Sequence, residues 1–157
     1  MSALPTSLSD CVLASDSDKR WLSNCVEGKI SFPSHNTKGL IFYGSYGSGK
    51  TLLANALPIF IEYAQATAND KVAYNFCYVY DGEIISITPN QTDREKFVLR
   101  QSFYGCGSLR ASDVDALVEQ IDNDMLNQKF VDCFTNQKYQ YFVFDEFDTI
   151  STTSQQK

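Results

Sequence analysis

The stretch Gly44-Ser45-Tyr46-Gly47-Ser48-Gly49-Lys50-Thr51 decides which fold to expect. It fits the pattern Gly-x-x-x-x-Gly-Lys-[Ser/Thr], in which glycines let successive backbone N–H groups curl around a phosphate. Both flanks agree with this reading. The apolar run 39–43 predicts a strand buried on both faces, and helix formers at helical spacing follow from Thr51. Because a helix that opens at Lys50 directs its positive end at the same anion, the stretch predicts a phosphate-binding loop.

The chemistry expected of this loop depends on its last two residues. Lys50 would reach the β and γ phosphates as a point charge, and the hydroxyl of Thr51 would be a ligand of Mg²⁺. The metal also needs a carboxylate partner, and the apolar run 139–144 predicts a strand that ends in Asp145-Glu146. Asp145 would hold Mg²⁺ through its water shell, and Glu146 would orient or deprotonate the attacking water.

Two segments resemble a known family. Residues 38–57 are similar to the strand, Walker A loop and helix of AAA+ ATPases, and residues 142–150 to their Walker B segment. Viral replication helicases built on the same core show similar motifs. The resemblance implies an α/β fold, a P-loop NTPase three-layer sandwich with a mostly parallel sheet, and ATP and Mg²⁺ as cofactors. The implied nucleotide-binding residues are Gly44, Ser45, Tyr46, Gly47, Ser48, Gly49, Lys50 and Thr51. The implied catalytic residues are Lys50 and Glu146, and the implied metal ligands are Thr51 and Asp145.

The chain also departs from the family pattern. Ser45-Tyr46 stands where many AAA+ members have prolines, and 95 positions separate Lys50 from Asp145, more than the family usually shows. The family's first sensor, arginine finger and helical lid all come after Walker B. The resemblance therefore implies an N-terminal portion truncated after Walker B, with a β-hairpin and helix insertion at about 71–110. Self-association or further chain would complete it, because a parallel sheet that lacks a strand leaves backbone groups unpaired.

The rest of the chain yields local predictions. Residues 1–16 are aperiodic and are expected to be a flexible lead-in, with a partial P-loop ATPase domain over 17–157. Pro58 is expected to kink or divide the helix after the loop. The remaining expected elements are a helix to about Val26 capped by Ser17, strands 71–80 and 83–88 joined by Asp81-Gly82, a helix 92–103 opened by a capping box, and a helix 113–130 capped by Ser112.

Composition excludes several function classes. The 157 residues are 43% apolar and carry a net charge of −6, and residues 111–157 hold nine acidic but only three basic side chains, so no bulk anion-binding surface is expected. No apolar run approaches the ~20 residues of a membrane helix, so no span is expected. The five cysteines are odd in number and scattered, which favours reduced thiols. We expect an intracellular, cytoplasmic protein, with a viral protein in a host cell as the alternative.

Three functions stay open on the sequence alone. The first is Mg²⁺-dependent ATP binding and hydrolysis in an oligomeric assembly that acts on a nucleic acid or a protein. The second is the ATPase portion of a viral-type replication helicase, and the third is a nucleotide-binding fragment that does not hydrolyse. The aromatic stripe Tyr74, Phe76, Tyr78 and Tyr80 is either the core face of the hairpin or a stacking platform for single-stranded nucleic acid.

Overall fold

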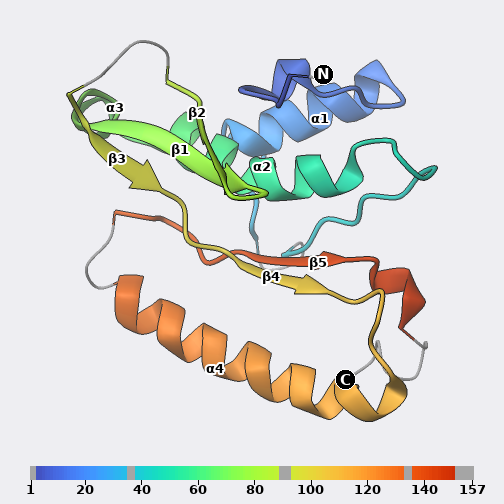
Figure 1. The fold of residues 1–157 in the computed structure, drawn as a ribbon. Helices are drawn as coiled ribbons and strands as arrows, with labels where there is room; N and C mark the ends of the chain where they lie inside the picture. Colours follow the sequence, from blue (N-terminus) through green and yellow to red (C-terminus); the bar gives the residue numbers. More distant parts are fainter. Residues whose placement is uncertain (1–2, 35–37, 89–92, 133–135, 151–157) are drawn as a thin grey trace. The chain divides into compact units, whose positions relative to one another are not determined.

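The computed structural model describes residues 3–34, 38–88, 93–132 and 136–150 (Figure 1). The chain forms two compact units, unit 1 (residues 1–99) and unit 2 (residues 100–157). The fold is α/β, with a small mixed sheet in unit 1 and a two-stranded parallel sheet in unit 2. In the described parts of the chain, no helix is long and apolar enough to cross a membrane.

The sheet of unit 1 is built around one central strand, β1 (Tyr74–Tyr80). Strand β2 (Glu83–Ser86) pairs with it antiparallel, and β3 (Glu95–Val98) pairs with it parallel on the other side. The hairpin turns at Asp81 and Gly82, whose φ angles of 49° and 79° are the positive values that a two-residue turn requires. The expected hairpin is therefore confirmed, although its bounds differ. Residues 71–73 belong to a helix, so β1 begins three residues later than expected, and β2 ends two residues earlier than expected.

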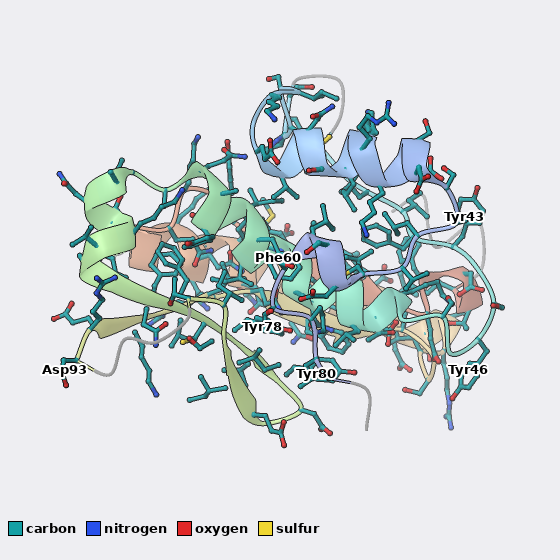
Figure 2. The ribbon with its side chains drawn as sticks, turned by 90° about the horizontal axis from the view of Figure 1, so that it is seen from above. Tyr43, Tyr46, Phe60, Tyr78, Tyr80 and Asp93 are labelled. Carbon is teal, nitrogen blue, oxygen red and sulfur yellow. The ribbon has the colours of Figure 1, made fainter. Side chains whose placement is uncertain are left out.

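Helix α2 (Lys50–Gln65) supplies more buried apolar side chains to the core of unit 1 than any other element, and the predicted helix after the loop is confirmed. It runs without interruption through Pro58, so the proline does not divide it. The ring of Phe60 lies near that of Tyr78 (Figure 2), and the two meet edge-on with their centroids 6.4 Å apart. The ring centroids of Tyr63 and Phe76 are 5.1 Å apart. Phe76 and Tyr78 are each only 1% exposed. The stripe on β1 is thus the core face of the hairpin, as its alternation favoured.

The remaining helices of unit 1 are α1 (Asp16–Val26) and α3 (Ala68–Ala73). The expected cap of α1 was wrong by two residues, because Ser15 and not Ser17 accepts the hydrogen bond from the backbone N–H of Asp18, at 3.0 Å. The segment before α1 includes the 3-10 turn η1 (Leu8–Asp10), and it is attached to the sheet, since the hydroxyl of Tyr78 donates to Pro5 O at 2.6 Å.

Unit 2 consists of strands β4 (Ser102–Gly105) and β5 (Phe142–Asp145), the helix α4 (Val114–Asp132) and the 3-10 turns η2 (Ala111–Asp113) and η3 (Phe147–Thr149). The strands pair parallel, and α4 runs beside them (Figure 1). Their core holds Tyr104, Cys106, Val114 and Ile150. The expected helix at 113–130 is confirmed, although η2 takes up the first turn that Ser112 was expected to cap. The strand expected over 139–144 is also present, but it begins three residues later, at Phe142.

Two expected elements were wrong. Residues 39–43 form no strand, and Ile41 and Tyr43 are 89% and 92% exposed, because no described segment pairs with this run. The segment expected to form a helix over 92–103 contains β3 and the start of β4 instead. There, long-range pairing of β3 with β1 and of β4 with β5 overrides the local capping pattern. Thr92, the expected cap, lies outside the described residues.

Candidate phosphate-binding loop and carboxylate pair

Three glycines give the loop at residues 44–49 an unusual backbone conformation. Gly44, Gly47 and Gly49 have φ angles of 150°, 75° and 83°, and the last two lie in the left-handed region that other residues rarely adopt. The backbone N–H of Ser48 donates to Ser45 O at 3.3 Å and closes the turn. Among the described residues, no atom beyond the adjoining residues lies within 4 Å of where a Cβ would project from Gly47 or Gly49, so both glycines are explained by the backbone conformation and not by crowding.

Lys50 is the first residue of α2, and its side chain folds back over the loop. Its Nζ atom donates to Gly44 O at 3.0 Å, Ser45 O at 2.7 Å and Ser48 Oγ at 3.3 Å. An ammonium group has three N–H donors, so these three oxygens use its whole donor capacity. The positive charge is therefore held directly over the glycine-rich turn.

Helix α2 holds the end of the loop in a fixed position. Gly49 is its N-cap and provides no side-chain hydrogen bond to the first turn. Thr51 follows in this turn, and its carbonyl accepts a hydrogen bond from Asn55 Nδ2 at 2.9 Å. Leu53, Ala56 and Ile59 are buried on the same helix. The loop thus leads into a helix that is anchored in the core, which limits how far Lys50 and Thr51 can move.

Large aromatic side chains flank and occupy the loop. Tyr46 lies within it and is fully exposed, and Tyr43 precedes it with 92% of its surface exposed (Figure 2). Neither ring is held in the core, so both leave the glycine-rich turn uncovered by apolar packing.

The carboxylate pair belongs to unit 2. Asp145 is the last residue of β5, is partly buried, and its carbonyl accepts a hydrogen bond from Cys106 N at 2.8 Å. Glu146 follows with φ 53° and ψ 39°, a left-handed conformation that is uncommon for a residue with a side chain. Its side chain is exposed. Such unusual backbone geometry is concentrated at functional sites, which agrees with the role expected for Glu146.

Thr149 was not among the residues that the sequence singled out. Its Oγ1 atom lies 2.9 Å from Cys106 O and 2.7 Å from Glu146 O, so it joins the end of β4 to the turn after β5. Cys106 lies 43 positions away along the chain, and no local pattern predicts a contact over that distance.

Burial, and then the charge of Asp145, raise the pKa of the Cys106 thiol, which therefore stays protonated at neutral pH.

The donor set suits a hard divalent cation. Hydroxyl and carboxylate oxygens, as in Thr51 and Asp145, are the ligands that Mg²⁺ prefers. Thr51 belongs to unit 1 and Asp145 to unit 2, so each is placed only within its own unit. Among the residues that the structure describes, no three His, Cys, Asp or Glu side chains gather as a metal group.

Comparisons with known proteins add no relative: no family model, curated protein or solved structure matches this chain. The candidate site therefore depends on the motifs and on the geometry of each unit.

Proposed function

We propose that this protein binds Mg·ATP through residues 44–51 and hydrolyses it with Asp145 and Glu146, as an AAA+-like P-loop ATPase with a mostly parallel three-layer sandwich. The observation that carries the proposal is the position of Lys50. Its ammonium group is held over a glycine-rich turn that leads directly into an anchored helix. Three features that bind a polyphosphate therefore occur at one place. They are a positively charged side chain, a glycine-rich turn and the N-terminus of a helix.

Each residue of the loop has a distinct task in this proposal. The left-handed glycines Gly47 and Gly49 direct backbone N–H groups toward the phosphate oxygens. Lys50 exchanges carbonyl acceptors for phosphate oxygens, which are negatively charged and form stronger hydrogen bonds with it. Thr51 would donate its hydroxyl oxygen to Mg²⁺, with Asp145 as the carboxylate partner. When bound, Mg²⁺ neutralises the charge that develops on the phosphate oxygens.

Hydrolysis requires a base or an orienting group for water, and Glu146 has that task. Its exposed carboxylate would accept a proton from the attacking water or hold that water in line with the γ phosphate. Positioned acid–base catalysis contributes about 10²–10⁴-fold to a rate. The expected result of Glu146→Gln is therefore bound ATP that turns over at least ~100-fold more slowly.

The test measures ATP affinity and turnover on the full chain with Mg²⁺ present. Lys50→Ala should lose most nucleotide binding, while Lys96→Ala, which removes an exposed lysine from β3, should keep it. Glu146→Gln should bind ATP but not turn it over, while Glu119→Gln, an exposed position on α4, should be as active as the unaltered chain. ATP binding that is equal in the Lys50→Ala and Lys96→Ala variants would refute the proposal.

The same experiment separates the other two functions. Turnover that rises when single-stranded DNA or RNA is added would favour the replication helicase. Phe76 and Tyr78 are buried, however, so these two members of the aromatic stripe cannot stack on bases in this fold. Binding without turnover, unchanged in Glu146→Gln, would favour the nucleotide-binding fragment. A partner chain that restores turnover would indicate completion by self-association or by further chain.

A further inference from the structure

The turn after β4 lies against the side chain of Glu146. Strands β4 and β5 are in parallel register with Gly105 opposite Asp145, so the residues that follow each strand leave the sheet at the same edge. Gly107 is one of these residues. A Cβ atom built on Gly107 would fall on the Oε2 atom of Glu146 and would lie 2.9 Å from its Cδ atom. Real Cβ atoms essentially never come this close to another heavy atom.

The backbone of Gly107 does not itself need a glycine. Its φ angle is outside the left-handed region, so an alanine could adopt the same conformation. Among the described residues, the three atoms nearest to its Cβ position all belong to Glu146, and the two closest are Oε2 and Cδ of the carboxylate. A side chain at position 107 would therefore have to displace the end of the exposed Glu146 side chain.

The backbone on both sides of this contact is fixed. Cys106 N donates to Asp145 O at 2.8 Å, and Thr149 Oγ1 contacts both Cys106 O and Glu146 O. Cys106 and Ile150 are buried in the core of unit 2. Because the two backbone segments cannot separate without breaking these contacts, an added methyl group at position 107 would move the carboxylate of Glu146 and not the chain.

We propose that Gly107 is a positioning residue for Glu146: by lacking a side chain, it leaves open the space in which the Glu146 carboxylate lies. The inference rests on the proposed function, in which Glu146 positions or deprotonates the attacking water. A carboxylate displaced by about 1 Å loses much of its effect on a proton transfer, since such misplacement can cost about 100-fold in rate. Nucleotide binding, which uses the loop of unit 1, should not change.

The matched pair of variants is Gly107→Ala and Gly105→Ala. Both add one methyl group near the end of β4, but the Cβ position of Gly105 has nothing within 4 Å. Gly107→Ala should lower kcat at least ~10-fold with less than a twofold change in ATP affinity, whereas Gly105→Ala should leave both unchanged. Equal kcat in the two variants and in the unaltered chain would overturn the inference.

A second readout does not depend on activity. The side-chain ¹³C resonances of Glu146, assigned by their loss in Glu146→Gln, should shift in Gly107→Ala and stay in place in Gly105→Ala. If no variant or unaltered chain hydrolyses ATP, the proposed function fails while the shifted resonances still support the contact. Unshifted resonances in Gly107→Ala would overturn the contact even in an active ATPase.

A folding control covers the case in which Gly107→Ala is unstable. Glu146→Ala removes every side-chain atom that the added methyl group would meet at less than 3.6 Å. The double variant with both alanines should therefore unfold at the same urea concentration as Glu146→Ala alone. A double variant that remains as unstable as Gly107→Ala would show that Glu146 is not what requires the glycine, and would overturn the inference.

Discussion

Removing the hydroxyl of Tyr104 tests how α4 is held to the sheet of unit 2. Tyr104 lies on β4 with only 4% of its surface exposed, and its hydroxyl donates to Asp124 Oδ2 on α4 at 2.5 Å. Burial, with the bond to Asp124, raises the pKa of Tyr104 to about 12. The phenol is therefore a neutral donor at neutral pH. Tyr104→Phe removes this donor and keeps the ring that packs against Phe144 at 5.0 Å.

The expected loss of stability in Tyr104→Phe follows from the type of hydrogen bond that is removed. A hydrogen bond to a charged group contributes about 1.5–3 kcal/mol to stability. Because phenylalanine keeps the ring and leaves no cavity, no loss of packing adds to the loss of the hydrogen bond. Asp124 is only partly buried, and water can replace the lost donor, which favours the lower end of that range. We expect the free energy of unfolding to fall by about 1.5 kcal/mol.

Urea unfolding of the full chain at pH 7, followed by circular dichroism, measures this loss. Tyr43→Phe is the matched control, because Tyr43 is 92% exposed and removal of its hydroxyl should change the free energy of unfolding by less than about 0.5 kcal/mol. Combined with Asp124→Asn, Tyr104→Phe should cost less than the sum of the two single changes, since one bond is lost in both. Tyr104→Phe and Tyr43→Phe variants of equal stability would refute the reasoning.

Two further predictions concern pH and the core. Burial is the largest cause that raises the pKa of Tyr78 and of Tyr104 from 10.0 to about 12, so the folded chain keeps protons that the unfolded chain releases. The free energy of unfolding should therefore stay constant up to about pH 10 and fall between about pH 10 and 12, with a shallower fall in Tyr104→Phe. Urea titrations at several pH values measure this dependence, and a free energy of unfolding that does not change with pH would contradict the prediction. Phe76→Ala should lower the free energy of unfolding by about 3–5 kcal/mol, because Phe76 is only 1% exposed. Phe103→Ala should lower it far less, because Phe103 is 48% exposed. Equal urea midpoints for the two variants would show that the core is misassigned.

Local chemistry in the sequence was enough for several elements of this protein. The helix after Gly49 and the turn at Asp81-Gly82 depend on glycines whose backbone conformations few other residues adopt, so their positions could be predicted. Helix α4 shows a helical repeat of apolar residues, and β5 is a short aromatic and β-branched run that ends in carboxylates. The residues of the candidate site, from Gly44 to Thr51 and at Asp145 and Glu146, also came from motifs in the sequence.

Tertiary structure alone decided the other features, because they depend on partners that lie far away in the sequence. Residues 95–98 became a strand since β1 offers them a parallel partner, although the preceding residues resemble the start of a helix. The apolar run 39–43 had the right composition for a strand but no described segment pairs with it. The contact of Gly107 with Glu146 and the tie through Thr149 join segments about 40 positions apart. A strand or a contact of this kind exists only when its partner is in place, and no local pattern carries that information.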